Sequence, residues 1–215
     1  MERHEDTHKI GFRKMAEKNE IVRKGYDEIA EKYQADRHIF HDTKELEELI
    51  GLLPRNARVL DVGSGAGVPY VKFLVESGFD TTGIDFSESM LKLAGRNVPE
   101  AEFIKQDMTR IGFQDNSFDG VTASYSIIHV PRERHSSLFQ SFHRILKPNG
   151  MMLISLGPDE WEGTDEYYGA EMFWSHYSPD KASRLIENAG FQSVWGKYVE
   201  CGGERHYWIL ARNKK

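Results

Sequence analysis

The sequence predicts an α/β fold of the doubly wound kind, in which helices cover both faces of a mostly parallel, seven-stranded sheet. Short apolar runs of strand length alternate with amphipathic helical stretches over residues 57–189. This alternation is typical of a parallel sheet, because a helix has to return the chain between neighbouring strands. The last two apolar runs are separated only by Cys201-Gly202-Gly203, so we expect an antiparallel last strand.

The individual elements follow from the spacing of apolar residues. Residues 13–52 are expected to be helical because Ile21, Val22, Ile29 and Ala30 recur at helical intervals. Strands are expected in the apolar runs at residues 57–62, 79–84, 101–105, 118–124, 151–156, 194–199 and 206–211. Helices are expected between them at residues 68–77, 87–97, 138–146 and 178–189. We divide the chain accordingly into a helical N-terminal cap, residues 1–52, and an α/β domain, residues 53–215.

Two local signals mark the ends of these helices. Ser87 has the side chain of an N-cap residue and precedes the helix at residues 87–97. Pro148-Asn149-Gly150 follows the helix at residues 138–146, and we expect it to form a turn before the next strand.

The composition of the chain limits the kinds of molecule that it is expected to bind. Charged residues make up 29% of the chain and the formal net charge is −6, so a nucleic-acid partner is disfavoured. The single cysteine, Cys201, excludes an internal disulfide and a cysteine-rich zinc site. His38 and His41 have H-x-x-H spacing without a third ligand signal, so no metal is expected. The N-terminus is too polar for a signal peptide and no run approaches about 18 apolar residues, so we expect a cytoplasmic protein without membrane contact.

The strongest local signal is a glycine-rich loop between an apolar strand and a helix. Glycines at 63, 65 and 67 allow a tight turn and a close approach of a ligand to the backbone. Position 68 is valine, where a dinucleotide fingerprint has its third glycine. Asp61, at the end of the strand, would repel a pyrophosphate and suits a ligand with an ammonium group. The loop therefore favours S-adenosylmethionine over a nicotinamide dinucleotide, which stays open as the alternative.

Further candidate residues stand at the ends of the next strands. Asp85 ends the second strand, where a carboxylate can accept hydrogen bonds from ribose hydroxyls. Asp107 follows the third strand and can accept from an adenine amino group, with Met108 against the ring. Tyr125 and His129 follow the fourth strand at the same rim of the sheet.

The segments VLDVGSGAG, GIDFSESML, FIKQDM, FDGVTASYSIIHV and LKPNGMMLI resemble, in order and spacing, the successive motifs of class I S-adenosylmethionine-dependent methyltransferases. More narrowly, they are similar to the small-molecule group called methyltransferase type 11. The resemblance covers about residues 55–156 and implies a Rossmann-like fold and methyl transfer to a small-molecule acceptor. The expected cofactor-binding residues are Asp61, Gly63, Ser64, Gly65, Asp85, Phe86, Met90, Asp107, Met108 and Tyr125. The alternatives are an RNA or protein methyltransferase, a non-catalytic S-adenosylmethionine-binding protein and a nicotinamide-dependent oxidoreductase.

Fewer features of the sequence indicate where the acceptor binds. His129 is the candidate general base, because it follows the fourth strand on the rim that faces the sulfonium; a structural histidine is the alternative. Tyr26 and Tyr33 resemble a cap segment that closes over the cofactor, with helix packing as the alternative. Residues 124–127 replace the D/N-P-P-Y motif, which disfavours methylation of exocyclic amines on nucleobases.

Residues 157–177 do not fit the pattern of alternating strands and helices. The segment is rich in aromatic residues, begins with Gly-Pro and shows neither strand nor helix periodicity. We expect it to form a lid over the acceptor, with Trp161 and Trp174 in contact with it, rather than a surface insertion. His176, Glu204 and His206 could also face the acceptor, although solvent exposure is the favoured interpretation of each.

Overall fold

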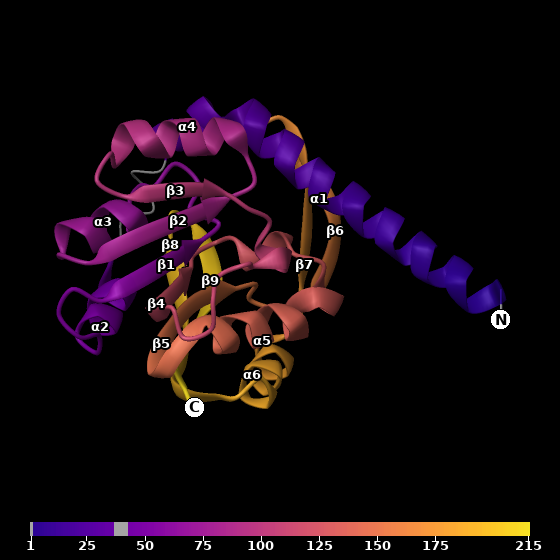
Figure 1. The fold of residues 1–215 in the computed structure, drawn as a ribbon. Coiled ribbons are helices and arrows are strands. Elements are labelled where there is room, and N and C mark those ends of the chain that lie inside the picture. The colour runs from indigo at the N-terminus through magenta and orange to yellow at the C-terminus, as the bar shows by residue number, and fades with distance from the viewer. Residues whose placement is uncertain (1, 37–42) are drawn as a thin grey trace.

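The computed structural model describes residues 2–36 and 43–215, with the side chains of residues 16–36 and 43–215. Seven strands form one sheet in the order β3-β2-β1-β4-β5-β9-β8 (Figure 1). Strand β9 is antiparallel to both of its neighbours, and the other pairs are parallel, which confirms the predicted fold class. The strands of this sheet are β1 (Arg58–Val62), β2 (Asp80–Asp85), β3 (Glu102–Lys105), β4 (Phe118–Ala123), β5 (Leu146–Leu156), β8 (Phe191–Cys201) and β9 (Glu204–Asn213).

Helices pack on both faces of the sheet because successive strand residues point to opposite sides. Leu60 of β1 belongs to a buried cluster that includes Phe139 and Ile186, from α5 and α6. Its neighbour Val59 belongs to a second cluster with Leu49 and Leu74, from α2 and α3. The helices are α1 (Glu2–Asp36), α2 (Lys44–Ile50), α3 (Tyr70–Glu76), α4 (Glu88–Asn97), α5 (His135–Ile145) and α6 (Pro179–Asn188).

The helical cap differs from the expected continuous stretch over residues 13–52. Helix α1 begins at Glu2, and its N-terminal part extends away from the sheet (Figure 1). His38 and His41 lie outside the described residues. Within the described ranges, no group of three or more His, Cys, Asp or Glu side chains is placed to hold a metal ion. No helix in those ranges is both long and apolar enough to span a membrane.

Polar contacts fasten α1 to the start of α4. The Oγ of Ser87 accepts from the amide of Met90 at 3.1 Å, so Ser87 is the predicted N-cap. The same hydroxyl donates to Asp27 Oδ1 of α1 at 2.7 Å, and the amide of Ser89 donates to that oxygen at 3.1 Å. Asp27 thus satisfies a donor of the first turn of α4, which would otherwise have no partner within the helix. The other oxygen of Asp27 accepts from Arg23 at 2.7 Å.

The expected turn at Pro148-Asn149-Gly150 lies inside β5, which begins directly after α5 at Leu146. Asn149 has φ 60°, and the register between β4 and β5 shifts between Phe118 and Gly120. Pro148-Asn149-Gly150 therefore forms an irregularity within β5 and not a separate turn before the strand.

Residues 157–177, whose sequence shows neither strand nor helix periodicity, are regular in the structure. They form a two-stranded antiparallel sheet of β6 (Trp161–Tyr167) and β7 (Ala170–His176). Tyr168 and Gly169 connect the strands and both have positive φ, 56° and 93°, which suits a two-residue hairpin turn. A period of 2 is not visible in the sequence because β6 is polar and largely exposed, whereas the adjacent residues Met172 and Phe173 of β7 are both buried.

Helix α1 and β7 approach each other closely at a glycine. A Cβ atom at Gly25 would lie 2.6 Å from Sδ of Met172 and 3.0 Å from the carbonyl oxygen of Glu171, so a side chain here would displace the Met172 thioether. Met172 and Phe173 are buried with Val22 and Ile29 of α1 in one apolar cluster. Burial of this cluster holds the hairpin against α1 (Figure 1).

Candidate active site

Two adjoining clefts lie at the carboxyl ends of the central strands. The first cleft has an empty volume of about 870 Å³ and is lined by the glycine loop, the residues after β2, β3 and β4, and α1. Every residue predicted to bind the cofactor lines it: Asp61, Gly63, Ser64, Gly65, Asp85, Phe86, Met90, Asp107, Met108 and Tyr125. The structure thus brings together side chains from separate motifs, because parallel strands end at the same edge of a sheet.

The second cleft, of about 910 Å³, lies beside the first. It is lined by the β6–β7 hairpin, the start of β9 and residues from α1 and the β4 rim. Both clefts are lined by Tyr26, Tyr33, Tyr125 and His129, which therefore form a shared wall.

The glycine loop has the conformation that its residues predict. Gly63 has φ 75° and Gly65 has φ 51°, in the left-handed region that side chains disfavour. A Cβ at Gly63 would lie 2.3 Å from Cβ of Ser126, so this glycine lets the loop meet the segment after β4. A Cβ at Gly65 would meet no heavy atom within 4 Å. Gly65 therefore borders open space that a ligand can fill.

Asp85 joins the loop to the start of α4. Its two oxygens accept from the amides of Gly65 and Ser87, each at 2.9 Å. Burial raises the pKa of the Asp85 carboxyl above its ordinary value, and these amides oppose the shift. Because each carboxylate oxygen has two lone pairs, the side chain retains capacity to accept from a ligand's hydroxyls.

Two more carboxylates are held by side chains that the sequence did not indicate. Oδ1 of Asp61, which is buried, accepts from the hydroxyl of Thr122 at 2.5 Å. Oδ1 of Asp107 accepts from the amide and the hydroxyl of Thr109, both at 2.8 Å, and Oδ2 accepts from Asn19 at 3.2 Å. Asn19 belongs to α1, so the cap contributes to the first cleft through a contact that no local motif could signal.

Two hydroxyls in the first cleft are unsatisfied. Oγ of Ser64 and Oγ of Ser124 are buried without a hydrogen-bond partner in the described part of the chain. A buried polar group in this state costs about 1–3 kcal/mol, so a polar ligand in the cleft would be stabilised by contact with them. Together with Asp61 and the open space at Gly65, these hydroxyls fit the amino-acid end of S-adenosylmethionine. Ser124 was not among the predicted site residues.

His129 is buried between two partners. Its Nδ1 lies 2.7 Å from the carbonyl oxygen of Phe173, which can only accept, so Nδ1 carries the hydrogen. Its Nε2 then accepts from the hydroxyl of Tyr26 at 2.8 Å. Burial lowers the pKa of His129 to about 4, so the imidazole is neutral near pH 7 and has one defined tautomer. The Tyr26 hydroxyl is thus the partner of this nitrogen, and both residues line the two clefts.

Tyr125 holds an uncommon backbone conformation where the clefts meet. Its φ is 55°, and its amide donates to Oγ of Ser155 at 2.6 Å. Its ring meets the imidazole of His206 edge-on, with centroids 4.7 Å apart. Left-handed non-glycine residues are rare and tend to gather at functional sites, where the surroundings stabilise them.

Trp161 and Trp174 line the second cleft. It also contains His176 and His206, and the preference for solvent exposure of these two histidines was wrong because they are 7% and 6% exposed. Nδ1 of His176 donates to the carbonyl of Asp159 at 2.6 Å. Nε2 of His206 lies 3.0 Å from Oε2 of Glu204.

Comparisons with known proteins agree with this geometry. A family model described as a methyltransferase domain matches residues 59–150. The chain is also 30% identical over 166 residues to an uncharacterized methyltransferase of Synechocystis sp., covering 74% of this chain and 76% of that protein. The chain belongs to the S-adenosylmethionine-dependent methyltransferases. The cofactor of this family is S-adenosylmethionine, which fits the first cleft as described.

Further similarity extends to proteins with named substrates. A demethylmenaquinone methyltransferase of Renibacterium salmoninarum is 34% identical over 139 residues, or 60% of this chain. This match spans 56% of that protein, so the chain covers about half the length of this curated relative. The crystal structure of the 1,6-didemethyltoxoflavin-N1-methyltransferase of Burkholderia thailandensis, with bound S-adenosylhomocysteine, superposes with a TM-score of 0.71. It is 19% identical and covers 94% of this chain and 91% of its own, which shows a shared fold.

Proposed function

We propose that this methyltransferase transfers the methyl group of S-adenosylmethionine to a small molecule bound in the second cleft. The observation that carries the proposal is the shared wall of Tyr26, Tyr33, Tyr125 and His129. A donor in the first cleft and an acceptor in the second would meet at this wall. Proximity and orientation supply much of the rate acceleration in such a transfer, because the methyl carbon of a sulfonium is already activated.

Different residues of the first cleft would bind different parts of the cofactor. Asp61, Ser64 and Ser124 would hold the amino-acid end, through one carboxylate and two buried hydroxyls. Asp85 would accept from the ribose hydroxyls, and Met108 would lie against adenine. Bound S-adenosylmethionine supplies a methyl group on a positively charged sulfur.

The Tyr26–His129 pair offers a route for a proton. An acceptor that loses a proton can pass it to the Tyr26 oxygen, while the Tyr26 hydrogen moves to Nε2 of His129 along the existing 2.8 Å hydrogen bond. Because the pKa of His129 is about 4, the imidazole is a weak base, and its hydrogen bond also fixes the position of Tyr26. His129 would thus act through Tyr26 rather than on the acceptor itself.

Several observations favour a small acceptor over RNA. The net charge of the chain is −6, and the second cleft is lined by acidic and aromatic side chains from a hairpin that packs on α1. Nucleic-acid sites instead present cationic side chains to phosphates. The two relatives with named substrates are called methyltransferases of demethylmenaquinone and of 1,6-didemethyltoxoflavin, which are small molecules.

Two measurements test the proposal. Calorimetric titration with S-adenosylhomocysteine and with NADH should show binding of the first and none of the second. Incubation with S-adenosylmethionine and pools of small metabolites should then release S-adenosylhomocysteine, detected by mass spectrometry. Binding of NADH alone would overturn the cofactor assignment. Cofactor binding without turnover on metabolite pools, but with turnover on RNA or protein, would overturn the acceptor class.

A further inference from the structure

One face of the β6–β7 hairpin forms an aromatic wall of the second cleft. The register pairs Gly163 with Trp174 and Trp161 with His176, so these alternate residues share one face. The Trp161 and Trp174 rings lie 6.2 Å apart at 53°, and the Tyr167 ring meets Trp174 edge-on at 5.9 Å. A Cβ at Gly163 would lie 3.0 Å from Cζ2 of Trp161, so glycine leaves room for the indole. Aromatic faces arranged in this way attract cations.

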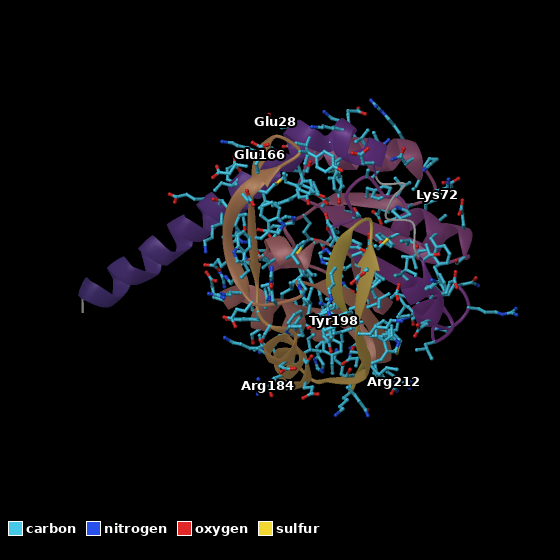
Figure 2. The ribbon with its side chains drawn as sticks, turned by 180° about the vertical axis from the view of Figure 1, so that it is seen from behind. Glu28, Lys72, Glu166, Arg184, Tyr198 and Arg212 are labelled. Atoms are coloured by element: carbon cyan, nitrogen blue, oxygen red, sulfur yellow. The ribbon has the colours of Figure 1, made fainter. Side chains whose placement is uncertain are left out.

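Carboxylates line the same cleft. Asp165 and Glu166 come from the hairpin, and Glu204 comes from the start of β9. In Figure 2, Glu166 lies on the β6–β7 hairpin and Tyr198 on β8, which pairs with β9. The side chain of Glu204 is 40% exposed and accepts from Tyr167 at 3.5 Å as well as from His206. Its charge is thus held in place and still accessible to a ligand.

His206 adds a buried polar atom that a ligand could complement. Its Nε2 faces the Glu204 carboxylate and donates to it at 3.0 Å. Its Nδ1 is buried and has no hydrogen-bond partner among residues 16–36 and 43–215. With a single ring hydrogen, placed on Nε2, this Nδ1 is an acceptor, which a donor such as an ammonium would complement.

No lysine or arginine lines the second cleft within the described ranges. The nearby cations of Lys18 and Arg132 pair with carboxylates, Lys18 with Glu162 of the hairpin at 3.2 Å and Arg132 with Glu160, just before β6, at 2.9 Å. A bound phosphate would therefore lack the cationic partner that such groups require in buried sites.

We propose that the acceptor in the second cleft is a small alkylamine that carries a positive charge and no phosphate group. The proposal rests on the proposed function and names the class of its acceptor. The aromatic rings of Trp161 and Trp174 would hold the ammonium and its alkyl groups, and Glu204 would supply the compensating charge.

The transfer to such an acceptor conserves charge. The acceptor nitrogen reacts as the free amine, so an ammonium acceptor first loses one proton to solvent, because Nε2 of His129, with a pKa of about 4, is too weak a base to take it. The nitrogen lone pair then forms the new N–CH3 bond, while the S–CH3 bond breaks and its electron pair stays on sulfur. One positive charge moves from sulfur to nitrogen, so the product is again an ammonium beside the same aromatic and acidic wall. That wall stabilises the charge as it develops on nitrogen.

Binding of a non-reactive cation tests the proposal without turnover. Choline is a suitable probe because its nitrogen has no lone pair, and 3,3-dimethylbutan-1-ol is its uncharged counterpart of the same shape. With the first cleft saturated by S-adenosylhomocysteine, calorimetry should show choline binding about tenfold more tightly than the uncharged alcohol. Phosphocholine should bind no more tightly than choline. Equal binding of choline and the alcohol, or tighter binding of phosphocholine, would overturn the proposal.

Variants locate the cation within the protein. Glu204→Gln and Trp161→Leu should each weaken choline binding by about threefold to tenfold. Both side chains are partly exposed, so neither change should unfold the chain. Glu200→Gln is the matched control, because Glu200 lies on β8 outside both clefts. Unchanged choline binding in Glu204→Gln and Trp161→Leu would place the cation elsewhere and overturn the proposal.

Different results would overturn the proposed function and the proposed acceptor class. Absence of S-adenosylhomocysteine binding to the unmodified protein would overturn the proposed function. Normal S-adenosylhomocysteine binding combined with no preference for choline over the alcohol would overturn the acceptor class alone.

Discussion

The two clefts are built in different ways, although they share a wall. The first is formed mainly by short segments that directly follow β1, β2, β3 and β4. The second is assembled from α1, the β6–β7 hairpin and the start of β9, which are far apart in the chain. A ligand site made of consecutive strand ends leaves a recurring motif in the sequence. A site made of distant segments leaves only scattered side chains.

The carboxylates of the clefts differ in their partners and in their exposure. Asp85 accepts from two backbone amides, and Asp107 accepts from Thr109 and from Asn19 of α1. Glu204 accepts from the side chains of His206 and Tyr167, and it stays partly exposed. The acid of the second cleft therefore remains accessible to a ligand.

The largest expected effect concerns the wall between the clefts. His129→Ala and Tyr26→Phe should each lower kcat by about 10²–10⁴ while S-adenosylhomocysteine affinity is retained. Because the pKa of His129 is about 4, its protonation should reduce kcat only as pH falls toward 4, not near 6.5. Single-turnover rates across pH, on a confirmed acceptor, measure both effects.

His135 provides the control for this comparison. It is also a buried histidine whose pKa burial lowers to about 4, but it lines neither cleft. His135→Ala should reduce stability without the fall in kcat. If His129→Ala lowered kcat by less than about threefold, the residue would be structural and the proton route would have to be abandoned.

Next in size is the effect of filling the open space at the glycine loop. Gly65→Val should weaken S-adenosylhomocysteine binding by about 100-fold or more, because the new side chain would extend into the first cleft. Gly78→Val is matched to it: Gly78 also has positive φ, 86°, and open surroundings, but it lies outside both clefts. Calorimetry and thermal unfolding of both variants distinguish a side chain that fills the cofactor's space from one that only strains the backbone. Equal loss of affinity in both would refute the special role of Gly65.

A smaller effect is expected at the ribose position. Charge-assisted hydrogen bonds contribute about 1.5–3 kcal/mol each, so Asp85→Ala should weaken S-adenosylhomocysteine binding by at least about tenfold. Asp119→Ala serves as control, because that carboxylate binds the Arg58 amide and Lys147 and lines neither cleft. Normal affinity in Asp85→Ala would show that the ribose lies elsewhere.

The smallest expected effect concerns the two tryptophans that line only the second cleft. Trp161→Ala and Trp174→Ala should change the acceptor KM or kcat by several-fold and leave cofactor affinity within about twofold, since both residues line only the second cleft. Trp195→Ala, on β8 and outside both clefts, should leave the acceptor KM unchanged. Wild-type turnover in both hairpin variants would contradict the role of the hairpin in acceptor binding.

The sequence by itself determined the parts of this protein that depend on neighbouring residues. Positive φ at Gly63 and Gly65 favours glycine, a strand that ends in Asp85 places a carboxylate at the sheet edge, and Ser87 caps the helix that follows. These are local backbone constraints, and the alternation of strands and helices then brings the strand ends to one edge. The fold class and the location of the predicted cofactor residues in one cleft follow from them.

Only the tertiary structure decided how the acceptor side is built. The tautomer of His129 is set by Phe173 and Tyr26, which belong to the hairpin and to α1. Burial of His206 beside Glu204 depends on packing against Tyr125. The hairpin was missed because β6 is polar and largely exposed and the adjacent residues Met172 and Phe173 of β7 are both buried, so neither strand alternates apolar with polar residues. These contacts join residues distant in the chain, so their geometry is set by burial in the assembled fold and not by local conformational preference.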